Sequence, residues 1–350
     1  MRVLVAMSGG VDSSVAAALL AGKGHEVVGA TMKLWGGASD SGCCSVSDVE
    51  DARRVARRLG VEHHVFNFTD EFEAGVVDPY VSAHLAGLTP NPCVECNRHL
   101  KFSAFLDRAL RLGFDAVATG HHARVGRGRD GQARLLRGMD AAKDQSYVLS
   151  CLTARQLDRV LLPVGETTKA EVRRLAAAWA LPTAHKADSQ EVCFVAGPRG
   201  AGSRRRFLEG RAELHAGRVL DVATGEQLGS VPAVELVTVG QRRGLGVAAG
   251  GRRFAVEVDV AAGVVLVGRE TDLAASGVAL SERTWVGEPL AEGSAVLAQA
   301  SAHGRPFAAV LGAGGLEFLE ARRKVAPGQV VALYVGDEVV GSGIASRAAA

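Results

Sequence analysis

The sequence predicts an α/β protein built on a doubly wound parallel sheet, followed by two small β-rich domains, the last of them a β-barrel. Over the first 120 residues, short Val- and Leu-rich runs alternate with segments of helical periodicity, which is the rhythm of β-α-β units. After about residue 200, short β-rich runs separated by Gly or Pro turns take over, as is typical of antiparallel sheets and small barrels. We therefore expect domains over residues 1–200, 201–274 and 275–350.

Local patterns justify each element of the first domain. Residues 2–7 hardly alternate between polar and apolar, which indicates a strand buried on both faces. Helix formers fill residues 12–20, and Gly22 and Gly24 supply a stop. A Ser/Asp cap opens a segment whose apolar residues recur on one helical face, residues 47–59. The remaining predicted elements are strands over residues 26–31, 61–68 and 116–119 and a helix over residues 101–112.

The joint between the first two domains is predicted at residues 197–206, a stretch rich in Gly, Ala, Pro and Arg. A second boundary falls near Ala274. The β-rich runs on either side of it include FAVEVDV, GVVLVG, SAVLAQASAHG and VVALYVG.

Composition limits the class of protein. Hydrophobic residues make up 47% and charged residues 22% of the 350, which is typical of a globular chain and not of a disordered one. No apolar run approaches the roughly 18 residues of a membrane span, and the apolar start of the chain is too short for a signal peptide. We therefore expect a cytoplasmic protein without a membrane partner. The net charge of +2 does not by itself indicate a nucleic-acid partner.

The string SGGVDSS at residues 8–14 follows the first predicted strand directly. Backbone N–H groups, hydroxyls and a helix N-terminus there are good anion ligands. The lysine of a Walker-type loop is missing, and Asp12 would repel phosphate unless magnesium lies between them. The alternative interpretation is a Gly/Ser turn that only caps a helix.

The string resembles the PP-loop of the ATP pyrophosphatases. That resemblance implies that the loop holds the β,γ-pyrophosphate as the leaving group and that AMP is transferred to an acceptor oxygen. Amide-forming synthetases and RNA-modifying enzymes share the loop, so it does not choose among them.

The cysteines and their surroundings narrow the choice. Two cysteine-bearing segments, TPNPCVECNR at residues 89–98 and KADSQEVCF at residues 186–194, flank TGHHARV at 119–125 and KDQSYVL at 143–149. VGQRRGLGV at 239–247 and VAPGQVVALY at 325–334 follow. Together with the loop, these motifs resemble the tRNA-specific 2-thiouridylase family over nearly the whole chain. The resemblance implies an adenine-nucleotide α-hydrolase-like fold and ATP-dependent 2-thiolation of the wobble uridine of tRNA.

The resemblance also assigns roles to residues. ATP, with magnesium tentatively at Asp12, would be bound by Ala6, Met7, Ser8, Gly9, Gly10, Val11, Asp12, Ser13, Met32 and Gly120. The target base would contact Asn91, Pro92 and Cys93. Further tRNA contacts would be His121, Lys143, Asp144, Gln145 and Gln329.

Two of the six cysteines would carry the sulfur chemistry. Cys193 would hold a persulfide, loaded by a cysteine desulfurase or a sulfur-relay protein, and Cys96 would be the partner nucleophile that ends in a disulfide with it. One alternative is an iron–sulfur cluster on Cys93, Cys96 and Cys193; another is a redox pair or metal half-site at Cys93 and Cys96. Cys43, Cys44 and Cys151 are interpreted as structural.

The chain departs from the family pattern at three places. His122 stands where the family usually has Tyr, the His-x-Gly before GQR is missing, and Ala300-Ser301 replace an Arg-Tyr pair that contacts tRNA. Two rival functions remain open. An ammonia-using amide synthetase would not need Cys96 or Cys193, and a nucleotide-responsive RNA-binding module would not release pyrophosphate.

Overall fold

The computed structural model describes residues 1–34, 45–188, 192–195, 201–247 and 251–347. Cys43 and Cys44 lie outside the described residues, as do residues 189–191 of the second cysteine motif. No helix within the described part combines the length and apolarity that a bilayer crossing requires.

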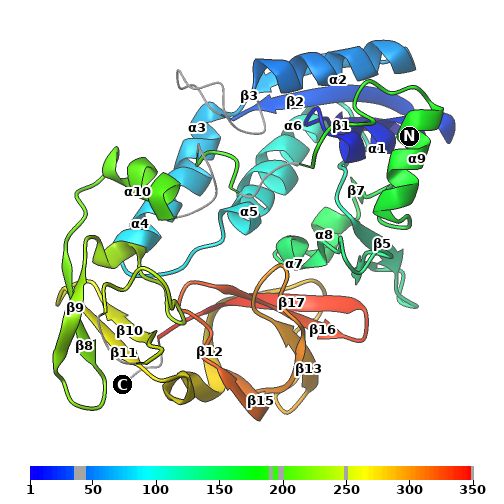
Figure 1. Cartoon of the computed structure of the whole chain (residues 1–350). Helices are drawn as coiled ribbons and strands as arrows, with labels where there is room; N and C mark the ends of the chain where they lie inside the picture. Colours follow the sequence, from blue (N-terminus) through cyan, green and yellow to red (C-terminus); the bar gives the residue numbers. More distant parts are fainter. Residues whose placement is uncertain (35–44, 189–191, 196–200, 248–250, 348–350) are drawn as a thin grey trace.

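A five-stranded parallel sheet forms the centre of the first part of the chain, in the order β3-β2-β1-β4-β7. The predicted α/β class is thereby confirmed (Figure 1). The strands are β1 (Arg2–Ala6), β2 (Glu26–Lys33), β3 (Glu62–Asn67), β4 (Ala116–Ala118) and β7 (Val160–Leu161).

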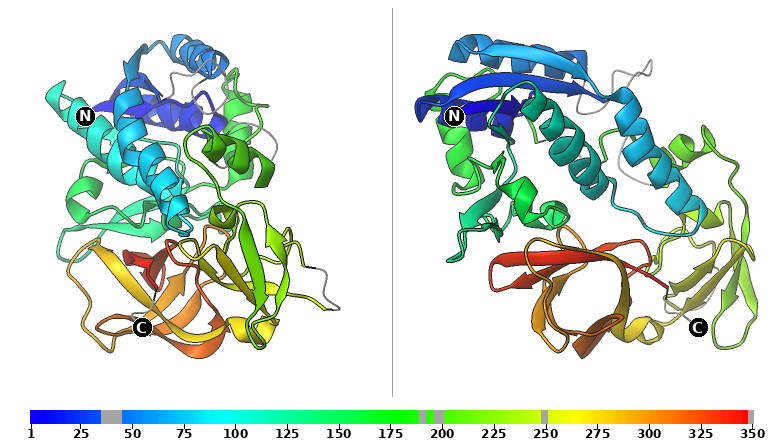
Figure 2. Two further views of the ribbon diagram at one scale, coloured as in Figure 1. Left: turned by 90° about the vertical axis from the view of Figure 1, so that its left-hand side faces the viewer. Right: turned by 180° about the vertical axis from the view of Figure 1, so that it is seen from behind.

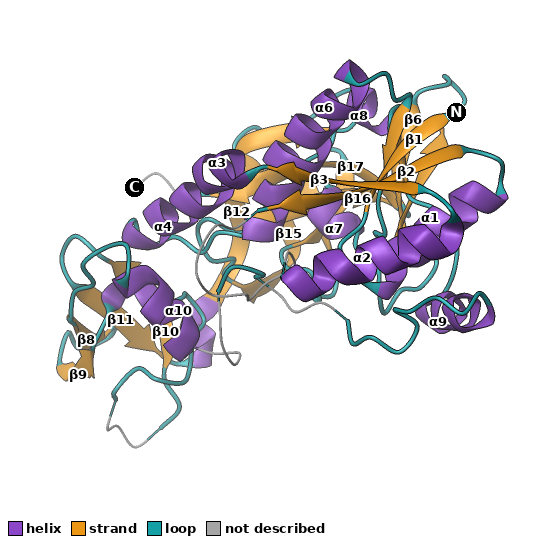
Figure 3. Ribbon diagram, turned by 90° about the horizontal axis from the view of Figure 1, so that it is seen from above, coloured by secondary structure: helices purple, strands orange, loops and turns teal. Residues whose placement is uncertain are grey.

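Helices cover both faces of this sheet. Alternate side chains of β1 point to opposite faces, so this strand contributes to a hydrophobic core on each side. Val3 and Val5 pack with α1 (Val11–Gly22), α2 (Val46–Leu59) and α9 (Lys169–Ala178). Leu4 and Ala6 belong to the other core, which they share with two long helical segments. Figure 3 shows these segments on the side of the sheet away from α1 and α2.

These two segments each combine α- and π-helical turns, and the predicted helix at 101–112 covered only the end of the second one. The first segment runs through α3 (Thr69–Phe72), η1 (Glu73–Val77) and α4 (Asp78–Leu85), and the second through α5 (Pro92–Glu95), η2 (Cys96–Ala104) and α6 (Phe105–Arg111). π-helical turns often occur at functional sites, and Cys96 is the first residue of η2.

Past the second helical segment, the chain forms a hairpin and two short helices. They are β5 (Ala123–Arg127), β6 (Ala133–Arg137), α7 (Ser146–Leu149) and α8 (Ala154–Leu157).

The middle of the chain forms a small mixed sheet in the order β10-β11-β8-β9. Its strands are β8 (Gly217–Asp221), β9 (Gln227–Val231), β10 (Phe254–Asp259) and β11 (Val264–Gly268), with short helices η3 (Val234–Leu236) and η4 (Glu270–Leu273). The expectation of an antiparallel sheet was incomplete, since β8 and β11 pair in parallel. Residues 201–206, expected as part of a joint, open a further helix, α10 (Ala201–Glu209).

The last part of the chain is a closed six-stranded antiparallel β-barrel, as predicted. Strand β12 (Ala274–Trp285) closes it by pairing with both β15 and β17. The other five strands are β13 (Ala295–Gln299), β14 (Phe307–Leu311), β15 (Gly315–Arg323), β16 (Val330–Val335) and β17 (Glu338–Ala345).

The hairpin β5–β6 extends the barrel sheet, although it belongs to the first part of the sequence. Leu135 and Leu136 of β6 pair with Val339 and Glu338 of β17. The hairpin therefore joins the α/β part to the barrel, which lies beneath it in Figures 1 and 2.

Candidate active site

The glycine loop lies between the end of β1 and the start of α1. The Thr31 hydroxyl of β2 donates a 2.8 Å hydrogen bond to the Met7 carbonyl and so fixes the loop to the sheet. Gly9 has φ +72°, and a Cβ atom there would lie 2.3 Å from the Asp48 carbonyl oxygen. Only glycine fits both constraints. Gly10 is the N-cap of α1, so the first N–H groups of that helix, which have no intrahelical partner, face the loop.

The serines of the loop mostly shape it. Ser13 Oγ accepts from the Ser8 N–H at 3.3 Å and donates to the Gly10 carbonyl at 3.1 Å. Ser14 Oγ donates to the same carbonyl at 2.8 Å and accepts from the Thr183 hydroxyl at 2.9 Å. Ser8 is exposed, so its hydroxyl and the backbone N–H groups are the donors best placed for an anion.

Asp12, in the first turn of α1, is held by two side chains that the sequence analysis did not assign to the ATP site. Lys169 Nζ lies 2.7 Å from each carboxylate oxygen, and His122 Nε2 lies 3.1 Å from Oδ1. Burial alone would raise the pKa of Asp12, but the hydrogen bonds from His122 and Lys169 outweigh it and lower the pKa.

A second carboxylate extends this charged group toward the cysteine motif. Asp188 pairs with Lys143 at 2.8 Å, Lys169 at 2.9 Å and Arg173 at 2.7 Å. Burial works to raise the pKa of Asp188, yet its hydrogen bonds with Lys143 and Lys169 hold that pKa well below the usual range. Asp188 precedes Cys193 by five positions, so the network links the loop to the chain segment that carries this thiol.

The turn after β4 packs directly against the loop. A Cβ atom on Gly120 would lie 2.5 Å from the Ser13 nitrogen, so glycine is required for this approach. His121 is buried and contacts Thr119 Oγ1 through Nδ1 at 2.7 Å. Burial lowers the pKa of His121 well below its usual range, which keeps its ring neutral.

The segment of residues 143–145 is tied to the same turn. Gln145 Oε1 accepts from the His122 N–H, and the Gln145 N–H donates to the His122 carbonyl, both at 2.8 Å. Asp144 accepts from Gly138 and Ser146 backbone N–H groups and pairs with Arg137 at 2.9 Å. The carboxylate of Asp144 therefore organises this segment from within.

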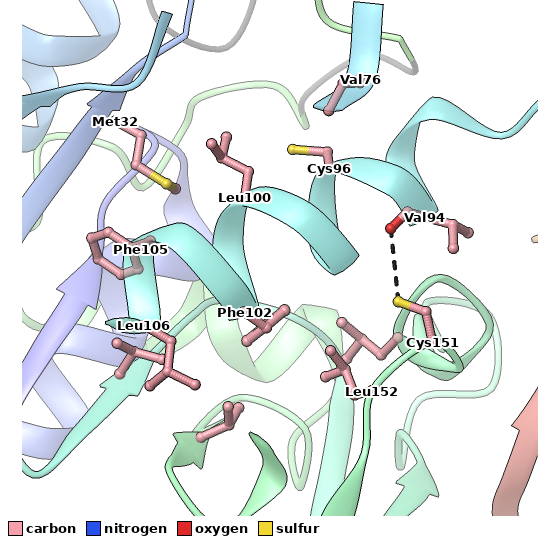
Figure 4. Close-up of a cluster of buried hydrophobic side chains, with 14 of the residues drawn as sticks. Met32, Val76, Val94, Cys96, Leu100, Phe102, Phe105, Leu106, Cys151 and Leu152 are labelled. Atoms are coloured by element: carbon pink, nitrogen blue, oxygen red, sulfur yellow. Dashed lines mark hydrogen bonds between the residues drawn. The ribbon is translucent and has the colours of Figure 1, made fainter. Parts of the chain in front are cut away.

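The first cysteine motif forms a helix start. Asn91 caps α5 by accepting from the N–H groups of Cys93 and Val94, and Pro92 fills the first helical position. Cys93 is exposed, whereas Cys96 is buried. Figure 4 shows Cys96, Leu100 and Met32 along one side of η2, in the core that α6 shares with β2.

The second cysteine motif holds Cys193 in a turn. The Val195 N–H donates to the Val192 carbonyl at 3.2 Å. The neighbouring Phe194 is buried among Phe72, Tyr80 and Phe207, with ring centroids 5.1 to 5.6 Å away. Cys193 is partly buried and packs against the same core that contains Cys96. Aromatic packing thus anchors a turn that presents the thiol.

The remaining described thiol, Cys151, and the predicted tRNA contact Gln329 lie outside the charged network around Asp12. Cys151 is buried, donates to the Val94 carbonyl at 3.7 Å, and has its pKa raised to about 12 by burial, as a structural thiol would. Gln329 is half-buried and accepts from the Ala326 N–H at 3.1 Å, at the start of β16. Among the residues with described positions, no three His, Cys, Asp or Glu side chains are arranged to hold one metal ion.

Three residues of this site, His122, Lys169 and Asp188, were missed as ATP-site residues. Lys169 lies 157 positions from Asp12 in sequence, so no motif spacing could join them. The string KADSQEVCF contains Asp188, and a carboxylate so close to a candidate nucleophile was the one available signal.

Three family models match successive parts of the chain. A tRNA methyl transferase HUP domain matches residues 1–197, a tRNA methyl transferase PRC-barrel domain matches 205–269, and an aminomethyltransferase beta-barrel domain matches 277–345.

Among solved structures, a 4-thiouridine synthetase in complex with RNA and bound ATP is similar to 60% of this chain and 50% of its own, with a TM-score of 0.38 and 18% identity. The U34-tRNA thiolase NcsA from Methanococcus maripaludis with its 4Fe-4S cluster has a TM-score of 0.34 and 18% identity, over 60% of this chain and 64% of its own.

Curated relatives match over their full length. The tRNA-specific 2-thiouridylase MnmA of Chloroflexus aurantiacus is 44% identical over 356 residues, 99% of this chain and 98% of that protein. The protein of the same name from Geobacter metallireducens is 44% identical over 98% of this chain and 96% of its own. With more than half of the chain matched by the HUP-domain model and full-length identity of 44%, this chain belongs to the tRNA-specific 2-thiouridylase family.

Proposed function

We propose that this protein is an ATP-dependent tRNA sulfurtransferase that thiolates C2 of the wobble uridine. The observation that carries the proposal is that one α/β domain holds both a glycine loop at the N-terminus of α1 and two thiol-bearing segments, which meet at the core on the opposite face of the sheet through Cys96 and Cys193. The matching family models are described as methyl transferase domains. The two thiols can carry sulfur and therefore favour the thiolation for which the relatives are named.

The glycine loop has the backbone shape and the helix N-terminus that a bound ATP needs. The backbone approaches closely at Gly9 and Gly120, and the open N-terminus of α1 favours phosphate oxygens. Magnesium would enter with the phosphates and, through Asp12, reduce their charge. Of the other predicted ATP residues, Ala6 ends β1, Met32 lies near the end of β2, Gly120 follows β4, and residues 11–13 open α1.

The first step activates the base. The uracil O2 atom attacks the α-phosphorus, the base loses its N3 proton, and the bond to the β-phosphate oxygen breaks as pyrophosphate leaves. The C2 oxygen is now part of an AMP group, which is a far better leaving group than oxide and departs only in the second step.

The second step transfers sulfur. The terminal sulfur of a Cys193 persulfide attacks C2, and AMP leaves with the electron pair of the C2–O bond. The Cys96 thiolate then attacks the Cys193 sulfur, which breaks the S–S bond and leaves the terminal sulfur on C2. The base takes up a proton at N3, and the sulfur remains as the thiocarbonyl. The resulting Cys96–Cys193 disulfide needs a thiol reductant before the next cycle.

The partners follow from this chemistry. A cysteine desulfurase or a sulfur-relay protein loads Cys193, and tRNA binds with its target base near Asn91, Pro92 and Cys93. His121, Lys143, Asp144, Gln145 and Gln329 contribute to tRNA docking, Asp144 through the shape of its segment. Because tRNA is the substrate, we place the reaction in the cytoplasm.

The partial reactions of cysteine variants test the proposal. Cys193→Ser is expected to release pyrophosphate with tRNA and ATP but to form no persulfide with a desulfurase and cysteine. Cys96→Ser is expected to accept the persulfide but to produce no free thiolated tRNA. Cys151→Ala, a buried thiol outside these steps, is the matched control and should retain both reactions.

The same assay separates the cluster alternative. If three thiolates on Cys93, Cys96 and Cys193 hold an iron–sulfur cluster, Cys93→Ser should lose all thiolation and anaerobically purified protein should contain stoichiometric iron. Residual thiolation by Cys93→Ser, with iron-free wild-type protein, supports the persulfide route.

A further inference from the structure

The glycine loop lacks a lysine in its sequence, but the fold brings one to it. Lys169 is the first residue of α9, and its Nζ atom lies 2.7 Å from both oxygens of Asp12 at the start of α1. The residue is only 9% exposed, so its ammonium group is confined to this position.

The backbone around Lys169 is fixed independently of its side chain. The Lys169 N–H donates to Asp140 Oδ2 at 2.9 Å, and Thr168 caps α9 by accepting from the Glu171 N–H at 3.2 Å. Helix α9 packs against α1 in one hydrophobic core. The ammonium group is therefore held at the N-terminus of α1, where an anion would bind.

The ammonium group has more than one acceptor. Its three N–H groups face two Asp12 oxygens and Asp188 Oδ1, the last at 2.9 Å. An arriving phosphate oxygen can replace one Asp12 oxygen while Asp188 keeps the side chain in place. His122 Nε2 still lies 3.1 Å from Asp12 Oδ1, so the carboxylate keeps a hydrogen-bond partner.

We propose that Lys169 binds the pyrophosphate portion of ATP and so takes the role of the lysine that a Walker-type loop carries within its own sequence. The inference rests on the proposed function, in which pyrophosphate is the leaving group. When the bond between the α-phosphorus and the bridging oxygen breaks, the electron pair goes to that oxygen. The nearby ammonium group stabilises this added charge without giving a proton to the leaving oxygen.

The competing explanation is that Lys169 only neutralises Asp12. A double-mutant cycle separates the two, because the neutralising role disappears once Asp12 has no charge. Binding of inorganic pyrophosphate without magnesium is measured by calorimetry on the full chain for the wild type, Asp12→Asn, Lys169→Met and the double variant. The probe is an anion alone, so the readout does not depend on turnover.

We expect Lys169→Met to weaken pyrophosphate binding by about tenfold or more in both backgrounds, as a charge-assisted contact requires. An unchanged affinity when Lys169→Met is added to Asp12→Asn would overturn the proposal. Asp12→Asn alone should tighten binding, since it removes a negative charge beside the phosphates.

Arg174→Met is the matched control, because it removes one positive charge from the same helix. Arg174 is exposed and forms an ion pair with Glu171 on its own helix, and its loss should leave pyrophosphate affinity unchanged. Lys169→Arg keeps the charge and should retain binding within a few-fold. The two failures are distinguishable, because wild-type protein that binds no pyrophosphate contradicts the proposed function itself, whereas a flat cycle contradicts only the role of Lys169.

Discussion

At the scale of single residues, burial divides the thiols into two kinds. Cys151 lies in the core and burial raises its pKa to about 12, whereas Cys93 is exposed at the start of α5. Because the thiolate is the nucleophile, we expect iodoacetamide at pH 8 to alkylate Cys93 and to spare Cys151. Peptide mass spectrometry reads the result, and guanidinium-unfolded protein, in which both should react, is the control. Equal alkylation of both in the folded protein would disprove this placement of Cys151.

Gly9 allows a second test at this scale. We expect Gly9→Ala to abolish ATP binding, because its Cβ would lie 2.3 Å from the Asp48 carbonyl oxygen and the loop would have to shift. Gly24→Ala is a matched control: it has a similar φ of +80° but nothing within 4 Å of the added atom. Both variants carry the roughly 1–2 kcal/mol strain of a left-handed backbone. Equilibrium ATP binding that is equal in the two variants would contradict the proposed fit of the loop.

At the scale of elements, helix α4 carries a buried histidine that makes folding sensitive to acid. His84 packs on Tyr80 at a centroid distance of 4.6 Å, beside η3. Burial, helped by the nearby charge of Arg204 and opposed by a hydrogen bond with the Glu235 backbone, lowers the pKa of His84 to about 4. The unfolded chain therefore binds more protons between about pH 6.5 and 4, so the stability that His84 contributes is present above this window and is lost as pH falls through it.

We predict that, because of His84, the free energy of unfolding falls by about 2 kcal/mol when the pH is lowered from 7 to 5. Denaturant titrations of wild type and His84→Gln at both pH values give the difference. The variant should lose less stability on acidification than the wild type, and an equal loss would show that His84 titrates normally in the folded protein.

The elements also show what local patterns can predict. The strands at 2–7 and 26–31 and the helix at 47–59 were recognisable because apolar periodicity and a cap coincide there. The parallel pairing of β8 with β11 was not, because it depends on a crossover connection and not on composition. The start of the long segment at α5 was missed because Pro92 and two cysteines obscure its helical periodicity.

At the scale of the whole molecule, one arginine joins the α/β part to the barrel. Arg137 of β6 lies 3.7 Å from the Tyr334 ring centroid and hydrogen-bonds to Asp144 at 2.9 Å and Gln299 at 3.2 Å. The Asp144 side chain is 8% exposed, so removing its partner leaves a buried charge. We expect Arg137→Met to destabilise the protein by about 3 kcal/mol.

The control is Arg127→Met, on the same hairpin. Arg127 pairs with Asp158 at the surface, where an ion pair contributes less than about 1 kcal/mol. Chemical denaturation measures both variants. Similar losses of stability in the two would mean that the Arg137 cluster does not hold the two parts together.

The site as a whole could be predicted only where its residues share a motif. Residues 6–13 and the cysteines stood out because neighbouring residues carry the chemistry. Lys169 and Arg137 did not, because each acts on a residue that only the fold brings near. His122 was recognised as a departure from the family pattern, but its contact with Asp12 was visible only in three dimensions.

The most direct test of the central claim is nucleoside mass spectrometry of tRNA incubated with the protein, ATP, magnesium, a cysteine desulfurase and cysteine. The account predicts 2-thiouridine at the wobble position, formed only when ATP is present and absent with Cys193→Ser. Unmodified uridine, or a uridine that gains a methyl group instead of sulfur, would contradict it.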